Sequence, residues 1–197
     1  MVAPFEERTI QAGTTTTYTL LLGNVGQEGP YGPTGYFDRI RVTLDSSSQG
    51  WASLVGGPVQ EFDLDWLETE PLQLVVTVPP SATIDLVDTT VIACQSLSDT
   101  DVTDSGTRVT RIEATPGVIV IPDHELIIAQ PGQVITYAHT VINTGNNNDT
   151  FELIANPGPN YANAILVEED GTVLVDNIVD LTAGQAISTW LRVTILN

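Results

Sequence analysis

The stretch from Pro131 to Leu153, PGQVITYAHTVINTGNNNDTFEL, constrains the fold of this 197-residue chain more than any other segment. Larger and smaller side chains alternate along it, and the larger ones share one face: Ile135, Tyr137, His139 and Val141. A period of two predicts a β-strand with one face on a core. The polar run that begins with Asn143 predicts a tight turn, because Asn and Gly tolerate positive φ. A return strand is expected from Thr150 to Ile154.

Much the same arrangement occurs earlier in the chain. AGTTTTYTLLLGNVG runs from Ala12 to Gly26, and YFDRIRVTL runs from Tyr36 to Leu44. The two copies predict a tandem repeat of one β-module, with domains at residues 1–114 and 115–197. The segment from Ala114 to Gly117 would be a short linker between them. The first copy also contains a Pro- and Gly-rich insertion, Gln27 to Gly35, that the second copy lacks.

The first module is expected to contain about seven strands, because turn residues recur roughly every 8–12 positions. The expected strand segments are Phe5–Gln11, Thr14–Leu22, Phe37–Leu44, Gly50–Val55, Val59–Trp66, Pro71–Val78, Thr89–Gln95 and Thr107–Glu113. No segment has a helical period. The chain is therefore predicted to be all-β and to form two tandem immunoglobulin-like sandwiches.

The second module is predicted to be similar but short of its last two strands. Its expected strands are Val118–Ile121, Glu125–Ala129, a hairpin of Ala164–Glu168 and Val173–Val175, and a final strand, Ile187–Ile195, in which Leu191–Ile195 matches Leu74–Val78. Counterparts of the last two strands of the first module are missing from the sequence. Such a sandwich would expose a sheet edge. Either the second sandwich is an adapted or trimmed version, or another subunit donates a strand to it.

Charge and composition narrow the function classes. The net charge is −19, and the six basic residues are all Arg. A surface of this kind repels nucleic acid and anionic lipid, so neither is an expected partner. The apolar content of 42% is ordinary for a globular chain. No apolar run approaches the roughly 20 residues of a spanning helix, and no signal peptide precedes Val2. An extracellular protein is expected, whose signal has been removed or lies outside this sequence.

The segment from Pro131 to Leu153 resembles the P-G-x-x-x-T-Y-x-x-x-V-x-N-T-G-x-x-x-D-T-F motif of the DUF11/NEW3-like repeat modules of bacterial and archaeal surface proteins. The first module matches this motif more loosely, at Gly13, Tyr18, Asn24, Gly26, Phe37 and Asp38. The resemblance covers nearly the whole chain. It implies an extracellular immunoglobulin-like sandwich that serves as a spacer, stalk or adhesion module. The motif is structural, so it carries no catalytic residue.

Residues that could perform chemistry are few, and each has a structural alternative. His139 takes the place of Leu20 of the first repeat, and a core histidine satisfied by hydrogen bonding is expected. His124 lacks partners at triad or zinc spacing. The single cysteine, Cys94, cannot form an intrachain disulfide, and a buried, inert thiol is expected. No catalytic site is predicted.

Two binding sites are weaker candidates. Asp99, Asp101 and Asp104 lie close together in an acidic loop and could supply oxygen ligands to calcium, although the spacing does not match an EF-hand. No other cofactor is expected. The aromatic residues could stack on carbohydrate or pack in the core and at interfaces; they are Trp51, Trp66, Trp190, Tyr31 and Tyr36.

These observations predict a non-enzymatic structural or adhesive protein of a cell-surface stalk or self-assembling filament. Its partners would be copies of itself or other surface proteins. The subunit joint is placed at the opening segment and the C-terminal strand, with the interface residues Val2, Phe5, Ile10, Ile187, Trp190, Leu191, Val193 and Ile195. The alternative is an accessory, carbohydrate-binding module of a larger secreted enzyme.

Overall fold

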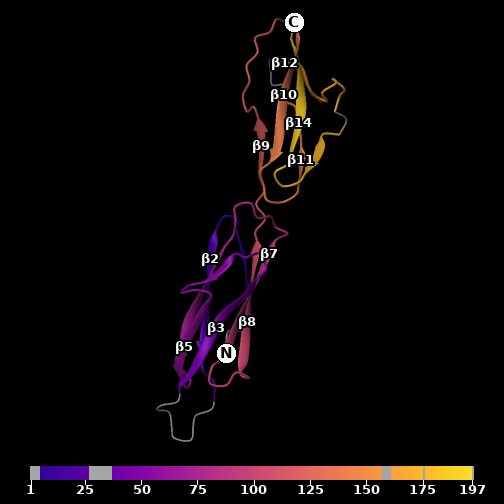
Figure 1. The fold of residues 1–197 in the computed structure, drawn as a ribbon. Coiled ribbons are helices and arrows are strands. Elements are labelled where there is room, and N and C mark those ends of the chain that lie inside the picture. Colours follow the sequence, from indigo (N-terminus) through magenta and orange to yellow (C-terminus); the bar gives the residue numbers. More distant parts are fainter. Residues whose placement is uncertain (1–4, 27–36, 157–160, 175, 197) are drawn as a thin grey trace. The chain divides into compact units, whose positions relative to one another are not determined.

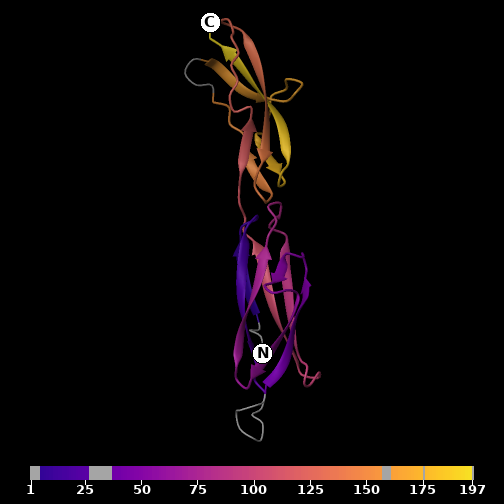
Figure 2. The same cartoon turned by 60° about the vertical axis from the view of Figure 1, so that its left-hand side comes forward.

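The computed structural model describes residues 5–26, 37–156, 161–174 and 176–196. The described residues form strands and no helix. The chain divides into two compact units, Met1–Glu113 (unit 1) and Ala114–Asn197 (unit 2). The strands of each unit can be followed in Figures 1 and 2. The predicted all-β fold is confirmed.

Unit 1 is a two-sheet sandwich. Its strands are β1 (Phe5–Ile10), β2 (Thr15–Gly23), β3 (Phe37–Ser47), β4 (Ala52–Leu54), β5 (Val59–Asp65), β6 (Thr69–Thr77), β7 (Val87–Ser96) and β8 (Thr103–Ile112). One sheet has the order β1-β8-β7-β3-β5 and the other has the order β2-β6-β4. Strand β1 is parallel to β8, and the other strand pairs of unit 1 are antiparallel.

The core of unit 1 lies between these two sheets. Side chains alternate along β2, so that Tyr18, Leu20 and Leu22 are fully buried while their neighbours Thr19 and Leu21 are exposed. Strands of both sheets supply the rest of the cluster, including Leu72, Leu74, Val76, Ile40, Val42, Ile92 and Ile112. Burial of apolar surface is the main favourable term in folding. The predicted period of two therefore identifies the face that holds this unit together.

Unit 2 is built on the same plan with fewer strands. Its strands are β9 (Val118–Ile121), β10 (Val134–Asn143), β11 (Asp149–Glu152), β12 (Tyr161–Val167), β13 (Ile178–Leu181) and β14 (Ala186–Ile195). One sheet has the order β12-β14-β10-β9, and the other contains β11 and β13.

The strand registers show which elements of the two units correspond. Tyr18 of β2 pairs with Leu74 of β6, and Tyr137 of β10 pairs with Leu191 of β14. Two further pairs correspond in the same way. Leu54 of β4 pairs with Leu74 of β6 as Leu166 of β12 pairs with Leu191 of β14. Asp38 of β3 pairs with Leu64 of β5 as Asp149 of β11 pairs with Leu181 of β13. Strands β10, β11, β12, β13 and β14 therefore repeat β2, β3, β4, β5 and β6. The tandem repeat predicted from the sequence is confirmed.

The Asn-x-Gly turn of the repeat has the same structural role in both units. Asn143 is fully buried, and its amide donates to the carbonyl oxygens of Asn147 and Leu181, at 2.8 and 3.0 Å. Its side-chain oxygen accepts from the Gly145 amide. In unit 1 the Asn24 amide donates to the Leu64 carbonyl, and the Gly26 amide donates to Asn24. The turn therefore fastens one sheet to the other.

Unit 2 departs from the sequence prediction in three places. Glu125–Ala129 forms no strand, and the expected hairpin is reduced to β12 and a single bridge between Val167 and Val173. Strand β13 was not predicted, because its four residues are too few to show a period. The predicted strand at Glu125–Ala129 is wrong because it lacks the neighbour that pairs with the corresponding strand in unit 1.

Candidate functional site

The candidate site is the side of unit 2 on which the repeat is incomplete. In unit 1, β3 pairs with β7, β7 with β8, and β8 with β1. In the described part of unit 2, β11 pairs only with β13, and nothing corresponds to β7 or β8. The predicted absence of two strands is thus seen in the topology. One edge of β11 is therefore left without a neighbouring strand.

The main-chain groups at this edge can be assigned from pairing. The Leu153 amide donates to the Asn177 carbonyl on the β13 side. Because alternate residues of an antiparallel strand point to opposite neighbours, Thr150 and Glu152 direct their main-chain groups to the other side. The Thr150 amide is held by the carboxylate of Asp149. Glu152 thus offers a main-chain donor and acceptor at an exposed position.

A second segment of unit 2, His124–Ala129, corresponds to β1 of unit 1. Its residues precede Gly132 by the same number of residues as Phe5–Ile10, strand β1, precede Gly13 in unit 1. Strand β1 pairs with β8, whereas Glu125–Ala129 makes no main-chain hydrogen bond to another strand among the described residues. Leu126 is 81% exposed and Ile128 is 95% exposed. Figure 1 draws this segment as coil.

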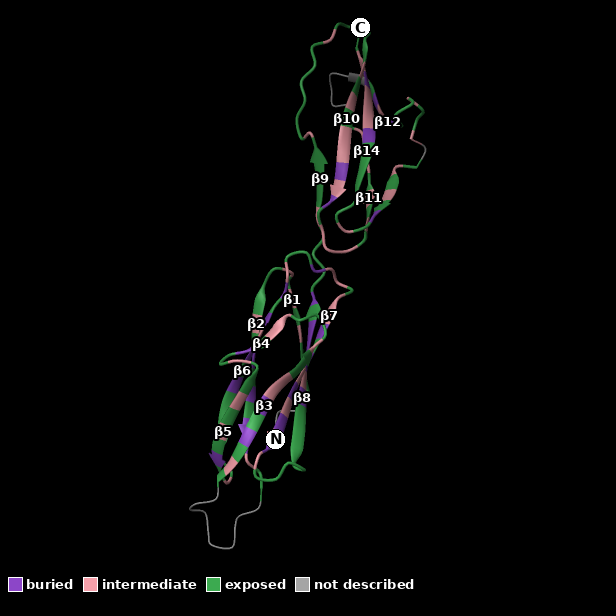
Figure 3. Cartoon of the chain, in the orientation of Figure 1, coloured by how far each residue is buried: buried purple, intermediate pink, exposed green. Residues whose placement is uncertain are grey.

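The inner face of the larger sheet of unit 2 is only partly covered. Tyr18 and Leu20 are completely buried in unit 1, whereas Tyr137 and His139, at the same positions, are half-buried. Val141, next to the covering strands β11 and β13, is buried. In Figure 3, buried residues (purple) recur along the strands of unit 1, whereas the strands of unit 2 are mostly exposed (green) or half-buried (pink). The open side therefore exposes part of the core.

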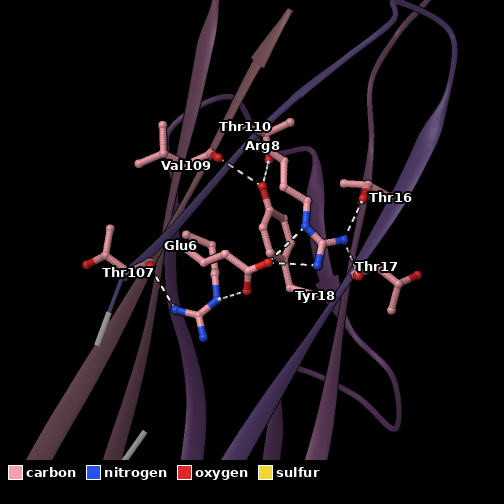
Figure 4. A network of polar contacts seen from close by, with 9 residues as sticks. Glu6, Arg8, Thr16, Thr17, Tyr18, Thr107, Val109 and Thr110 are labelled. Atoms are coloured by element: carbon pink, nitrogen blue, oxygen red, sulfur yellow. Dashed lines mark hydrogen bonds and ion pairs between the residues drawn. The ribbon is translucent and has the colours of Figure 1, made fainter. Parts of the chain in front are cut away.

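Unit 1 shows how the same side is closed when all strands are present (Figure 4). The Tyr18 hydroxyl lies 2.9 Å from both the Val109 carbonyl oxygen and the Thr110 hydroxyl of β8. Arg8 of β1 lies over the Tyr18 ring, 4.5 Å from its centroid, and pairs with Glu6 at 2.7 Å. Burial raises the pKa of Tyr18, so its hydroxyl keeps its proton. Strands β1 and β8 are thereby joined to β2.

A buried arginine completes this closure. Arg108 of β8 is fully buried, with its Nε 3.6 Å from Glu6, and it donates to the Thr107 carbonyl. Burial lowers the pKa of Arg108, and Glu6 opposes that shift. Unit 2 retains Glu125 at the position of Glu6 but has Ile127 at that of Arg8.

Two polar groups on the larger sheet of unit 2 have no hydrogen-bond partner among the described residues. The Tyr137 hydroxyl has no hydrogen-bond partner among the described residues. The hydroxyl of Thr189, opposite His139 in the pairing of β10 with β14, is buried without a partner there. In unit 1 the Asp38 carboxylate accepts from the Ser96 hydroxyl of β7 at 2.8 Å, and Asp149 occupies the corresponding position of unit 2. Aligning the two repeats residue by residue would have identified these positions from the sequence.

The residues predicted for the subunit joint lie in two strands with different surroundings. Phe5 and Ile10 lie in β1, an edge strand that pairs with β8 on one side, and Val2 is outside the described residues. Ile187, Trp190, Leu191, Val193 and Ile195 lie in β14, which is central in its sheet between β10 and β12. Strand β14 therefore has no free edge for a further strand. Contacts through these side chains remain a prediction.

The other predicted site residues are placed as follows. The carboxylates of Asp99 and Asp104 accept from the amides of Asp101 and Ser105 in their own loop. The described residues contain no group of three or more His, Cys, Asp or Glu side chains arranged to hold a metal ion. Calcium binding by Asp99, Asp101 and Asp104 stays a prediction, to be measured as a fall in melting temperature on addition of EDTA.

Cys94 is buried as expected, whereas His139, which was expected in the core, is only half-buried. One ring nitrogen of His139 lies 3.3 Å from the Pro122 carbonyl oxygen. Cys94 is 6% exposed, and burial raises the pKa of its thiol to about 11. His124 is exposed. Neither histidine lies in a group that could hold a metal ion among the described residues.

Unit 1 contains a separate hollow at one end of its sandwich. Its volume is about 520 Å³, and its lining includes the aromatic residues Phe37 and Trp66 and the carboxylates of Asp38, Asp99 and Asp104. Trp66 donates its indole N–H to the Gly26 carbonyl. Trp51 packs against the core of unit 1, and Trp190 is half-buried in unit 2. Tyr31 and Tyr36 are outside the described residues.

Comparison with known proteins gives no family. No protein-family model matches the chain, and no curated protein matches it. The chaperone–tip adhesion subunit complex of archaic Csu pili from Acinetobacter baumannii is similar over 95% of this chain and 85% of that chain, with 10% identity and a TM-score of 0.35. The C-terminal domain of the AgI/II polypeptide BspA from Streptococcus agalactiae is similar over 96% of this chain and 86% of that chain, with 10% identity and a TM-score of 0.31. At these scores the similarities carry no argument about function.

Proposed function

We propose that this chain is a non-enzymatic structural or adhesive building block of a cell-surface stalk or self-assembling filament. It would be joined to its neighbours by strand addition at unit 2. The observation that supports this proposal is a difference between the described parts of the two units: β7 and β8 close the module in unit 1, and no described strand takes their places in unit 2. An unpaired strand edge is a template for pairing with another chain.

An extracellular location is part of the proposal. The strongly acidic, lysine-free composition suits a soluble surface exposed to salt. The resemblance of Pro131–Leu153 to the DUF11/NEW3-like modules supports the same location. In the residues that the structure describes, no helix is long and apolar enough to cross a membrane.

The environments of the reactive side chains support a non-enzymatic role. The Cys94 thiol is buried, and its raised pKa keeps it protonated near neutral pH. A ring nitrogen of His139 is close to a main-chain carbonyl. Asp63 is paired with Arg39 at 2.6 Å, which lowers the pKa of Asp63. Each of these groups is therefore buried or held in a structural contact.

The assembly is tested by light scattering and negative-stain imaging over a wide range of protein concentration. The chain is expected to form linear assemblies as its concentration rises. Replacing Glu152 with Pro removes a main-chain donor at the open edge while leaving the β13 side intact, and it should reduce assembly. Glu152→Ala keeps that donor and is the matched control. A strict, well-folded monomer at every concentration would defeat self-assembly.

The hollow in unit 1 supports a second candidate function, carbohydrate binding by an accessory module. Aromatic faces and carboxylates of the kind that line it, such as Trp66 and Asp38, are suited to stack on and hydrogen-bond sugars. The test is a glycan array of the wild-type chain beside Trp66→Ala, Trp190→Ala and Tyr31→Ala. Binding that is lost in one of these variants would favour this function, and an array without signal would end it.

A further inference from the structure

We propose that the outer face of the larger sheet of unit 2 is a contact surface between two copies of this chain. The outer face is the side of the sheet β12-β14-β10-β9 opposite to the buried side chains of Val141 and Val193. This inference rests on the self-association of the proposed function and names a surface that is separate from the edge of β11.

The strand registers define which side chains lie on the outer face. Trp190 of β14 is opposite Ala138 of β10 and Val167 of β12, and Ile142 of β10 is opposite Ile119 of β9. Opposite residues in neighbouring strands point to the same side of a sheet, and successive residues of a strand point to different sides. The large apolar side chains of the outer face are therefore those of Ile119, Ile121, Val134, Ile142, Ile165, Val167 and Trp190.

Much of this apolar surface is accessible. Ile121 is 50% exposed and Val134 is 58% exposed, and β9 is green along its length in Figure 3. Trp190 is half-buried. Arg192 donates to the Gly171 carbonyl at 3.2 Å, so the turn after β12 borders the face on that side. The open part of the outer face therefore lies over β9, β10 and β14.

The corresponding face of unit 1 is more polar. Its counterparts of the apolar residues are Gln73 for Trp190, Ser53 for Ile165, Thr15 for Val134 and Gly23 for Ile142. Unit 1 forms a sandwich of the same design with these residues, so the module does not need large apolar side chains at these positions. Their presence in unit 2 indicates a contact outside the module.

Charge favours a second copy as the partner. The net charge of −19 makes two copies repel each other. The strands β9, β10, β12 and β14 contain no Asp or Glu, and Arg192, the one basic residue in the sequence of unit 2, lies on the outer face. A strongly basic partner would find no carboxylate on these strands, and a strongly acidic partner would find a single arginine. Two outer faces can meet without opposing carboxylates, whose approach would be unfavourable.

The outer face is also self-complementary in shape. Trp190 is large, whereas its neighbours Ala138, Ala186 and Ser188 on the same face are small. Two sheets pack face to face about 10 Å apart with interdigitating side chains. In a two-fold pair, which uses the same patch on both subunits, each Trp190 would fill the space above the small residues of the other copy.

The edge of β9 is less suited to association than the face. Strand β9 has four residues and is flanked by Pro116 and Pro122. Proline has no N–H to donate and blunts a strand edge against pairing. We therefore place the contact on the face of the sheet.

The size of the outer face predicts a weak pair. Strands about 4.8 Å apart that rise about 3.4 Å per residue give a contact of roughly 500 Å² on each copy. Stable specific interfaces bury about 800 Å² on each partner. The dimer is therefore expected above about 10 μM protein, and not at nanomolar concentration.

The test is sedimentation velocity of the full chain with Glu152→Pro, which blocks strand addition at β11, from about 1 μM to about 1 mM. This chain is expected to dimerise as its concentration rises. Adding Trp190→Gln and Ile165→Ser, the residues of unit 1, should weaken dimerisation at least about tenfold. Leu126→Ser removes an exposed apolar side chain outside the sheet and should leave dimerisation unchanged. A monomer throughout the range, or equal dimerisation with and without the two substitutions, would overturn the proposal.

A charge substitution tests the same face without removing an apolar side chain. Ser188→Glu should weaken dimerisation at least about tenfold relative to Ser188→Gln, because carboxylates of the two copies would then approach each other. Added salt should reduce that difference. Equal dimerisation of the two variants would overturn the contact at this face.

Trp190 can report the contact directly in a Trp51→Phe/Trp66→Phe variant. Its emission should shift to shorter wavelength, and its quenching by acrylamide should fall, as dimers form. Dimers in which neither property changes would overturn the outer face as their contact. A chain that stays monomeric and loses glycan binding with Trp190→Gln would also overturn it, because the face would then be a sugar-binding surface.

The outcomes separate this inference from the proposed function. If dimers form with Glu152→Pro but the wild type never forms longer assemblies, strand addition fails and the outer face stands. If the wild type forms long assemblies and the Glu152→Pro chain is a monomer at every concentration, the outer face fails and the proposed function stands.

Discussion

The residue that best explains the repeat is the asparagine of its Asn-x-Gly turn. Asn143 and Asn24 bridge strands of opposite sheets through one side chain. Gly145 is required beside Asn143 because a Cβ there would lie 2.7 Å from the Thr115 carbonyl oxygen. The sequence predicted a turn at this position from residue type alone. It could not predict the inter-sheet bonds, because their acceptors, Leu64 and Leu181, are remote in the chain.

Replacing Asn143 with Ala should destabilise unit 2 by about 2 kcal/mol, because buried main-chain groups lose their partners. The measurement is urea unfolding followed at Trp190, the tryptophan of unit 2. Asn148→Ala is the control, since Asn148 is exposed and should change stability by less than about 0.5 kcal/mol. Equal stabilities of the two variants would show that the turn does not fasten the sheets.

Cys94 should be unreactive in the folded chain and should make stability fall at alkaline pH. Burial raises the pKa of its thiol from 9.0 to about 11. Between these values the unfolded thiol loses its proton while the folded thiol keeps it, so the free energy of unfolding falls as pH rises from about 9 to about 11. Below that range the contribution is fully present.

The measurement is the rate of iodoacetamide labelling with and without urea, together with unfolding curves at increasing pH. Cys94→Ala is the control, and it should show a shallower alkaline fall than the wild type. Rapid labelling of the folded chain would contradict the buried environment of the thiol.

At the scale of elements, whether a strand could be predicted from the sequence depended on its length. Long strands such as β2 and β10 show a clear period of two, and the one-sided burial of β2 in unit 1 follows from it. Strand β13, with four residues, shows no period. Glu125–Ala129 has a strand-like sequence but forms no strand, because the pairing partner that β1 has in unit 1 is missing in unit 2. Strand formation at an edge is therefore a property of the neighbour as well as of the segment.

The attachment of β8 to β2 through Tyr18 gives a prediction for this element. Tyr18→Phe should lower the stability of unit 1 by about 1 kcal/mol, because the Val109 carbonyl and the Thr110 hydroxyl lose a partner. Tyr137→Phe should leave the stability of unit 2 unchanged, because the Tyr137 hydroxyl has no partner among the described residues. The measurement is urea unfolding, followed at Trp51 and Trp66 for unit 1 and at Trp190 for unit 2. A loss of stability in both variants would mean that Tyr137 already has a partner.

At the scale of the whole molecule, the chain contains two modules of one design but unequal completeness. Both turns and all corresponding registers agree. Among the described residues of unit 2, the buried apolar side chains are few: Val141, Ala164, Val167, Leu181 and Val193. Since the apolar area removed from water largely sets stability, unit 2 should be the weaker unit.

Thermal or urea unfolding should therefore occur in two transitions, with unit 2 unfolding first. Fluorescence separates them, because Trp190 alone reports unit 2 in a Trp51→Phe/Trp66→Phe variant, while Trp190→Phe leaves only unit 1 visible. A single transition that both variants report at the same midpoint would mean that unit 2 is as stable as unit 1 without its last two strands.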